Sequence, residues 1–197
     1  MSRARRERKR EVKVSVRSPF PPHALYDLWG WVQACLSAVA DDFSPTTVEE
    51  FIEWHQELAA ETTDIAYEGK LITIPLVTTW GVWGDDEALG GYARFERDPI
   101  RLWTGNAHCV FRKDFWGRRI TVPALTQVAR EIFAVGVERI QMGVFATNTA
   151  MQGLIAAAGA VQEGRLRMQT LKGGKYADIV VYGVTPDELE KAASKEG

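Results

Sequence analysis

The segment best suited to bind an anion is a basic turn between a predicted strand and a predicted helix. The strand is expected at Ala107–Phe111, and the helix at Pro123–Val135. Residues 112–119 between them carry four cationic side chains, Arg112, Lys113, Arg118 and Arg119. A helix N-terminus offers unpaired N–H groups and the positive end of the helix dipole. The pattern therefore predicts a phosphate-binding turn.

Two side chains close to this turn could transfer a proton. His108 lies on the predicted strand itself, and Glu96 ends the strand expected at Leu89–Glu96. Imidazole titrates near neutral pH, and a carboxylate can act through a water molecule, so both are candidate catalytic bases. The alternatives left open are a histidine beside the core and a surface carboxylate. His55 lies on an apolar helix face and is expected to be a core residue.

The composition is typical of one globular domain. The chain has 197 residues, of which 46% are hydrophobic and 25% are charged. Its two cysteines, Cys35 and Cys109, cannot build a disulfide framework, which predicts a reducing compartment. The sequence has no apolar run of the roughly 20 residues that span a bilayer, and no signal-peptide core. We expect a cytoplasmic protein with no membrane contact and no bound metal.

Charge is distributed unevenly along the chain. The first ten residues hold six Lys or Arg and one Glu, a net charge of +5, whereas the whole chain carries −2. The cationic residues of this arm are Arg3, Arg5, Arg6, Arg8, Lys9 and Arg10. Such an arm predicts contact with nucleic acid or with neighbouring subunits of an assembly; the alternative is a solvated tail.

The hydrophobic periodicity predicts a mixed α/β domain with helices on both faces of its sheet. We expect a basic arm at 1–10, one domain at 11–185 and a polar tail at 186–197. The expected strands are Glu11–Val16, Leu71–Trp80, Leu89–Glu96, Ala107–Phe111, Arg139–Phe145, Ala160–Leu171 and Lys175–Val184. The expected helices are His23–Ala40, a segment capped by Thr46 or Thr47, Pro123–Val135 and Asn148–Ala158.

Several short motifs occur in a fixed order along residues 88–190. They are an aromatic-Trp-Gly-Arg turn, an Ala-Leu pair, an Asn at a helix start, a Gly at that helix's end, a Glu-Gly-x-x-Arg run and a Tyr-x-Asp strand. Their positions are Phe115–Arg118, Ala124-Leu125, Asn148, Gly159, Glu163–Arg167 and Tyr176–Tyr182. This order resembles the GNAT superfamily, the Gcn5-related N-acetyltransferases, and within it the ribosomal-protein alanine N-acetyltransferases. The resemblance implies a single domain, a mixed sheet of about seven strands, and a V-shaped splay between the fourth and fifth strands.

The resemblance also implies acetyl transfer from acetyl-CoA to a protein N-terminus or another amine. Backbone groups of Cys109, Val110 and Phe111 would hold the pantetheine arm in the splay. Asn148 would contact the same arm, and His108 or Glu96 would take the proton of the amine. The amides that would bind the pyrophosphate are those of Gly117, Arg118, Arg119, Ile120 and Thr121. The residues expected near the acceptor groove are Trp80, Trp83, Tyr92, Trp103 and the acidic run Asp85–Glu87; the alternative for the aromatic ones is packing in the core and loops.

The chain departs from the family pattern at two places. Arg119 and Thr121 replace small residues of the pyrophosphate loop, and we expect their side chains to crowd a phosphate. Against this, the cations of Arg118 and Arg119 could hold phosphate oxygens from outside. Met151 and Ile155 occupy positions where the family has a proton-donating Ser or Tyr. We therefore expect micromolar to millimolar affinity for CoA at best. Two functions stay open: an N-acetyltransferase, or a catalytically inactive protein of the same fold that serves as a structural or binding component of an assembly, for example a virus or phage particle.

Overall fold

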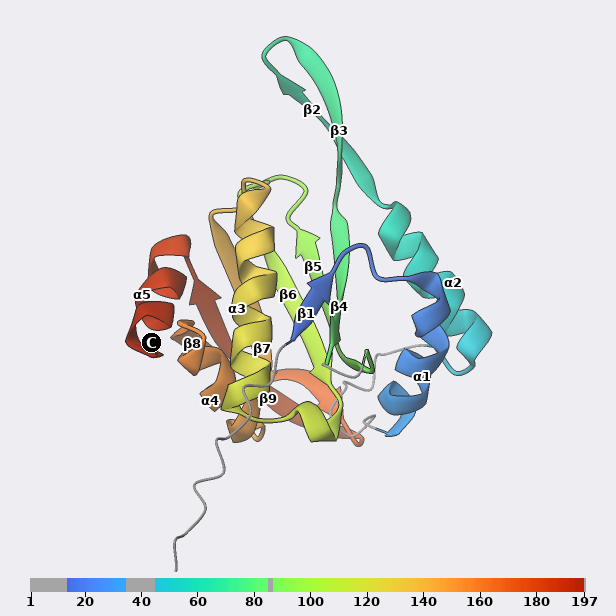
Figure 1. Cartoon of the computed structure of the whole chain (residues 1–197), viewed down its shortest axis with the longest axis vertical. Coiled ribbons are helices and arrows are strands. Elements are labelled where there is room, and N and C mark those ends of the chain that lie inside the picture. The colour runs from blue at the N-terminus through green and yellow to red at the C-terminus, as the bar shows by residue number, and fades with distance from the viewer. Residues whose placement is uncertain (1–13, 35–44, 85–86, 197) are drawn as a thin grey trace, which may run out of the picture.

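A mixed sheet of seven strands forms the centre of the computed structural model, which describes residues 14–34, 45–84 and 87–196 (Figure 1). The strand order is β1-β4-β5-β6-β7-β9-β8, and every neighbouring pair is antiparallel except β6 with β7. The strands are β1 (Ser15–Arg17), β4 (Val77–Trp83), β5 (Leu89–Arg97), β6 (Thr104–Phe111), β7 (Arg139–Phe145), β8 (Val161–Lys172) and β9 (Lys175–Val184). The predicted sheet of about seven strands is confirmed.

Helices cover both faces of the sheet, as predicted. The short 3-10 helix η1 (Pro22–Ala24), α1 (Leu25–Ala34) and α2 (Val48–Ala60) lie on one face. On the other lie α3 (Arg118–Ala134), α4 (Thr149–Ala157) and α5 (Pro186–Glu196). Neighbouring residues of β6 show the alternation, because Val110 packs with the α1–α2 cluster and Cys109 with the α3 cluster.

The start of α2 follows the capping chemistry that the sequence predicts. The Thr47 hydroxyl accepts a hydrogen bond from the Glu50 amide at 3.2 Å. The Glu50 carboxylate in turn accepts from the Thr47 amide at 3.3 Å, which completes a capping box. Phe51 and His55 are the buried residues of this helix, so the expected core position of His55 is confirmed.

The predicted strand Leu71–Trp80 is wrong. Pro75 ends one strand, β3 (Lys70–Pro75), and Val77 begins β4, which belongs to a different sheet. The strand β2 (Thr62–Tyr67), which the sequence analysis did not predict, pairs with β3 in a hairpin that projects from the body (Figure 1). The continuous β-branched run concealed this break, because periodicity alone does not separate two strands joined by one residue.

Several other boundaries also differ from those predicted, among them the start of β6 at Thr104. Helix α3 begins at Arg118, so Pro123 lies inside it and not at its start. The first helix begins as the 3-10 turn η1, and residues 35–40 of its predicted span lie outside the described chain. The expected tail 186–197 is helix α5 through residue 196, and its Leu189 is buried in the core. The basic arm 1–10 also lies outside the described residues.

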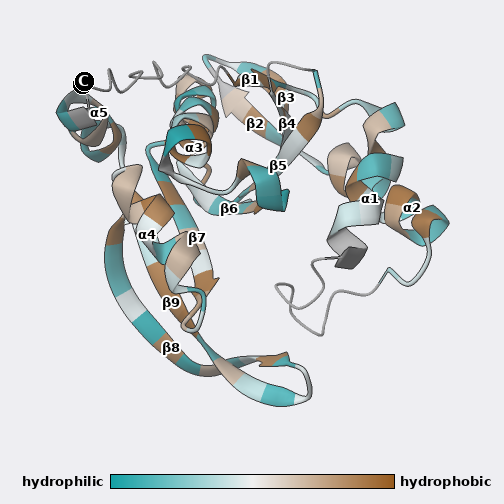
Figure 2. Ribbon diagram, turned by 60° about the horizontal axis from the view of Figure 1, so that its bottom comes forward, coloured by the Kyte–Doolittle hydropathy of each residue, from teal (hydrophilic) through white to brown (hydrophobic). Residues whose placement is uncertain are grey.

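Strands β8 and β9 form the predicted closing hairpin around Gly173 and Gly174, both with positive φ. The hairpin is long and curves beyond the rest of the sheet (Figure 2). It bends toward the side of the molecule that carries α1 and α2, and its ribbon stays apart from those helices. Across residues 14–34, 45–84 and 87–196, no helix combines the length and apolar character needed to cross a membrane.

Candidate active site

The parallel pairing of β6 with β7 is short, and the two strands then separate. Thr104–Asn106 pairs with Arg139–Gln141, and the described pairing ends there, although β6 continues to Phe111 and β7 to Phe145. Along its other edge β6 stays paired with β5 as far as Phe111. These are the fourth and fifth strands of the main sheet in chain order, so the expected V-shaped splay is confirmed.

A small apolar hollow of about 40 Å³ lies under the splay. Cys109 of β6, Met142 of β7, Leu125 of α3 and Ile155 of α4 are among its walls. Burial raises the pKa of the Cys109 thiol to about 12. Because the thiolate is the nucleophilic form, Cys109 is not a nucleophile at neutral pH. The splay therefore suits the direct transfer of a group between two ligands better than a transfer through a covalent intermediate on Cys109.

A ligand in the splay would contact the backbone of β6, because the neighbouring side chains point elsewhere. Val110 points its side chain toward the α1–α2 face, and Phe111 is buried near the start of α3. The Phe111 carbonyl oxygen already accepts a hydrogen bond from the Trp116 indole at 2.7 Å. Trp116 itself is mostly exposed, so its ring does not occupy the core under the splay.

The N-terminus of α3 carries backbone amides that have no partner within the helix. Gly117 precedes the helix with a φ of 138°, which favours glycine. Its carbonyl oxygen accepts from the amides of Ile120 at 3.2 Å and Thr121 at 2.9 Å. Among the described residues, the amides of Gly117 and Arg119 have no such acceptor. Two of the five expected pyrophosphate amides, those of Ile120 and Thr121, are therefore already hydrogen-bonded, and the binding role of all five stays a prediction.

The expected crowding of this turn by Thr121 is wrong. Thr121 is fully buried, and its hydroxyl donates to the Phe115 carbonyl oxygen at 2.7 Å. It ties the 3-10 turn η3 (Lys113–Phe115) to α3, and its hydroxyl is engaged inside the protein. The Arg119 side chain is exposed, and Ile120 packs against a buried cluster. The Arg118 side chain lies outside the described part of the structure.

Asn148 caps α4, the helix that follows β7. Its side-chain oxygen accepts from the Met151 amide at 3.2 Å. Gln152, one turn later, donates to the carbonyl oxygens of Phe145 and Ala146 at 3.1 Å each. Met151 packs against the core, so the expected acid position holds an apolar side chain.

Glu96 and His108 meet on the α1–α2 face of the sheet, beside the splay. The His108 ring nitrogen Nε2 lies 3.3 Å from Glu96 Oε2. The other carboxylate oxygen, Oε1, accepts from Arg94 at 2.7 Å. The hydrogen bond from His108 and the charge of Arg94 lower the pKa of Glu96, although burial opposes them. The structure therefore joins the two predicted bases into one cluster with a buried cation.

Arg94 was not among the predicted site residues. The signal for it lies in the strand pairing, because Arg94 stands directly opposite His108 in the antiparallel β5–β6 register. Side chains directly opposite each other in such a pair lie on the same face of the sheet. Because Arg94 also lies two residues before Glu96 on the same strand, the register predicts that it can contact both Glu96 and His108.

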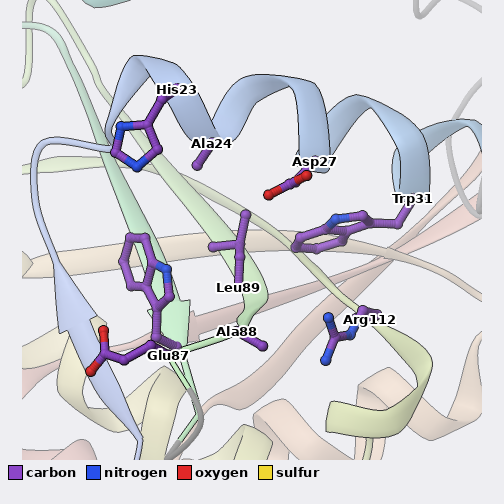
Figure 3. Close-up of a pocket in the computed structure, with 9 residues that line it drawn as sticks. His23, Ala24, Asp27, Trp31, Glu87, Ala88, Leu89 and Arg112 are labelled. Atoms are coloured by element: carbon purple, nitrogen blue, oxygen red, sulfur yellow. The ribbon is translucent and has the colours of Figure 1, made fainter.

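A second hollow, of about 420 Å³, opens between α1 and the start of β5 on the same face of the sheet (Figure 3). Asp27, Trp31 and Leu89 line it, as do the expected groove residues Trp83 and Glu87. Glu87 is paired with Arg17 at 2.5 Å, whereas no described cation pairs with Asp27. The hollow therefore holds the Asp27 carboxylate and the Trp31 indole together with the Arg112 side chain. The Trp83 ring is already covered by the Arg17 guanidinium, whose central carbon lies 4.9 Å from the ring centroid.

The other aromatic residues expected at the acceptor groove lie elsewhere. Trp80 is buried on the α3 face and donates to Glu131 at 2.6 Å. Tyr92 is buried against Phe20 and His55, and Trp103 is half-exposed in the turn that precedes β6. Among the described residues no three His, Cys, Asp or Glu side chains are grouped as a metal site would need.

No protein-family model matches the sequence. The structure is similar to that of a spermidine N-acetyltransferase from Vibrio cholerae in complex with CoA and spermine. That likeness has a TM-score of 0.74 at 12% identity and covers 90% of this chain and 98% of the other. Mycobacterium smegmatis RimJ in complex with CoA-disulfide gives a TM-score of 0.72 at 20% identity, over 92% and 87% of the two chains.

An acetyltransferase of the GNAT family from Streptococcus pneumoniae is also similar, with a TM-score of 0.65 at 16% identity. The likeness covers 88% of this chain and 99% of the other. Because these likenesses extend over nearly whole chains, the fold of this protein is that of the GNAT acetyltransferases. They include a spermidine N-acetyltransferase as well as RimJ, so they single out no branch of that superfamily.

Proposed function

We propose that this chain is an acyl-CoA-dependent N-acetyltransferase that acts on a protein N-terminus or another amine. One juxtaposition carries the proposal. The Glu96–His108 pair borders the point at which β6 leaves β7, and the same strand leads into the open amides at the start of α3. A proton acceptor, a slot between strands and an anion site thus follow one another along β6.

The N-terminus of α3 is suited to the pyrophosphate of CoA. Among the described residues, the amides of Gly117 and Arg119 have no backbone acceptor, and the space beside Gly117 is open, since a Cβ built there would meet nothing within 4 Å. The helix dipole adds a positive potential at the same place. When bound, acetyl-CoA would supply the acetyl group as a thioester in the splay.

The Glu96–His108 pair is suited to receive the proton of the acceptor amine. An ammonium group has no lone pair, so it must lose a proton before it can attack a carbonyl carbon. The His108 side chain is about half exposed, whereas Glu96 is more enclosed and is held by Arg94. We therefore assign proton removal to His108 and the orientation of its ring to Glu96. Met151 and Ile155 can donate no proton, which lowers the expected rate by about 10²–10⁴.

The hollow at α1 supports an amine as the acceptor class. Asp27 offers a carboxylate without a described partner, and Trp31 offers an indole ring to a cation and its hydrocarbon chain. The Trp83 ring is already covered by Arg17, and the Arg112 cation lines the same hollow. The similar Vibrio cholerae structure contains spermine, a cation of this chemical class. A small polyamine and a peptide N-terminus are both consistent with these groups.

One observation favours the alternative function, a catalytically inactive structural or binding component. The hollow under the splay measures about 40 Å³, room for a few water molecules, whereas a pantetheine arm needs far more. In that case the basic arm Arg3–Arg10 would contact nucleic acid or neighbouring subunits, and the protein would reside in a particle such as that of a virus or phage. The two functions differ in whether acetyl-CoA enters the splay.

An acetyl-transfer assay tests the proposal. Release of free thiol from acetyl-CoA is measured with spermidine and with a short peptide that has a free N-terminus. The His108→Asn variant should lose about 10²–10⁴ in kcat with little change in stability. Arg130→Gln, which removes a surface ion pair with Glu190 on the opposite face of the sheet, is the control. Absence of transfer by the wild-type protein at millimolar acetyl-CoA would favour the structural alternative.

A further inference from the structure

We propose that Arg94 is a positioning residue of this site. It fixes the Glu96 carboxylate in the orientation that aims the His108 ring at the acceptor. The inference rests on the proposed function for the role of His108, but its structural part concerns three side chains of the chain itself.

The carboxylate of Glu96 is held from both sides. Its Oε1 accepts from Arg94 at 2.7 Å, and its Oε2 lies 3.3 Å from His108 Nε2. Arg94 and Glu96 are two residues apart on β5, and His108 stands directly opposite Arg94 on β6. Rotation of the carboxylate would break a contact at each end, so the three side chains act as one unit.

Arg94 is itself held in place by α2. Its guanidinium carbon lies 4.9 Å from the centroid of the Trp54 ring, and its side chain is only 12% exposed. A cation over an indole face is stabilised by the ring quadrupole. Because a buried charge is costly unless it is paired, the ion pair with Glu96 is what offsets the burial of this guanidinium.

The surroundings of Arg94 are poorly matched to a purely structural role. Arg94 Nε, His55 Nε2 and the Tyr92 hydroxyl are buried without a hydrogen-bond partner among the described residues. Each such group costs stability, and apolar residues of similar shape would avoid that cost. Native proteins retain such conflicts mainly at functional sites. We infer that the guanidinium is retained for what it does to Glu96.

The arrangement selects one form of the His108 ring. An ionised carboxylate accepts hydrogen bonds only, so it favours the tautomer with the proton on Nε2. Nδ1 then carries the lone pair that can take a proton from an amine. Without the Arg94 charge, a half-buried Glu96 would take up a proton more readily and would no longer demand this tautomer.

Three elements of the described structure, β5, β6 and α2, contribute the titratable groups around the Glu96 carboxylate. Arg94 and Tyr92 come from β5, His108 from β6 and His55 from α2. Burial, reinforced by the charge of Arg94, lowers the pKa of His55 to about 4, so this ring is neutral at pH 7. Burial raises the pKa of Tyr92, so it is also neutral. The Arg94 guanidinium is thus the permanent cation of the group.

The test compares Arg94→Gln and Arg94→Lys with Arg130→Gln, which removes a surface ion pair with Glu190. The Glu96 carboxyl is followed by carbon NMR as a function of pH, in protein without CoA. Arg94→Gln should raise the Glu96 midpoint, and Arg94→Lys should raise it by less, because lysine retains the charge. Arg130→Gln should leave it unchanged. If Arg94→Gln does not fold, Arg94→Lys still reports, since an unshifted midpoint in every folded Arg94 variant overturns the proposal.

Kinetics separate this proposal from the proposed function. Arg94→Gln should lower kcat at least about tenfold and move the acidic limb of the pH–rate profile upward, with KM for acetyl-CoA unchanged. Arg94→Lys should recover part of kcat. A shifted Glu96 midpoint in a protein without transferase activity would overturn the proposed function and support the coupling. An active enzyme whose kcat and pH profile ignore Arg94 would overturn the positioning role.

Discussion

Replacement of Thr121 tests whether the start of α3 is shaped from within. Thr121→Val keeps the side-chain volume and β-branching but removes the hydroxyl that donates to the Phe115 carbonyl oxygen at 2.7 Å. Thr121 is fully buried, so that oxygen would be left without a partner away from water. The expected loss is about 1–3 kcal/mol in the free energy of unfolding. Threonine and valine have similar helix propensities, so little of this loss would come from the helix itself.

Thr121→Ser is the matched control, because it keeps the hydroxyl and removes one methyl group. Its expected cost is about 0.5–1.5 kcal/mol, the usual cost of one methyl group in a core. Urea denaturation at pH 7 measures both variants. For a domain of this size, 2 kcal/mol corresponds to a fall of about 4–8 °C in Tm.

The two variants also test whether the Thr121 side chain makes a buried hydrogen bond to Phe115 or obstructs the phosphate site. If the Thr121 side chain obstructed the phosphate site, Thr121→Ser would bind CoA more tightly than the wild-type protein. The structure predicts no such gain, because this side chain is buried and its hydroxyl is engaged by Phe115 inside the protein. A Thr121→Val protein as stable as the wild type, or tighter CoA binding by Thr121→Ser, would refute the reasoning.

Substitutions at three further positions test other features of the structure. In the unfolded chain the His55 ring takes up a proton below its ordinary pKa of 6.5, but in the native protein it does so only below about pH 4. The free energy of unfolding should therefore fall by up to about 3 kcal/mol as the pH is lowered from 6.5 to 4. His55→Leu should flatten that dependence in urea titrations at pH 7 and 4.5, and an unchanged slope would contradict the assignment. Asn148→Ala should lose about 1 kcal/mol with its cap, whereas Asn148→Ser should keep the cap. Weaker CoA binding by an equally stable Asn148→Ser would then reveal a contact with the ligand. Gly117→Ala should cost about 1–3 kcal/mol from backbone strain, since a Cβ there meets nothing within 4 Å, and an unstrained variant would contradict the φ of 138°.

Local sequence signals were sufficient where one interaction dominates. The cap at Thr47 with Glu50 follows from side-chain chemistry that needs no tertiary contact. The turn at Gly173-Gly174 follows from the positive φ that its hairpin demands. The order of the later strands followed from their apolar runs, and the splay was expected from the resemblance.

The misplaced elements depended on tertiary structure. Helix α5 has a polar sequence, but Leu189 is buried in the core and Glu190 pairs with Arg130 of α3 at 2.7 Å. The start of α3 at Arg118 was missed because Pro123 was taken as a first helical residue. Proline removes only one intrahelical bond near a helix start, so a helix can include it in its early turns.

The candidate site shows the same division. Glu96 and His108 were each expected as a base from residue type and position, but their separation of 3.3 Å depends on the β5–β6 register. Arg94 was missed because a cation within a strand gives no signal of burial under α2. The inward direction of Thr121 likewise depends on η3, which no periodicity predicts.

Calorimetric titration of acetyl-CoA tests the central claim most directly. The account predicts binding in the micromolar to millimolar range, and much weaker binding of acetyl-pantetheine, which lacks the pyrophosphate and so cannot use the amides of Gly117 and Arg119. Gly117→Ala should weaken acetyl-CoA binding and leave acetyl-pantetheine unaffected. No binding at millimolar acetyl-CoA, or equal affinity for the two ligands, would contradict the claim that this fold retains an acyl-CoA site.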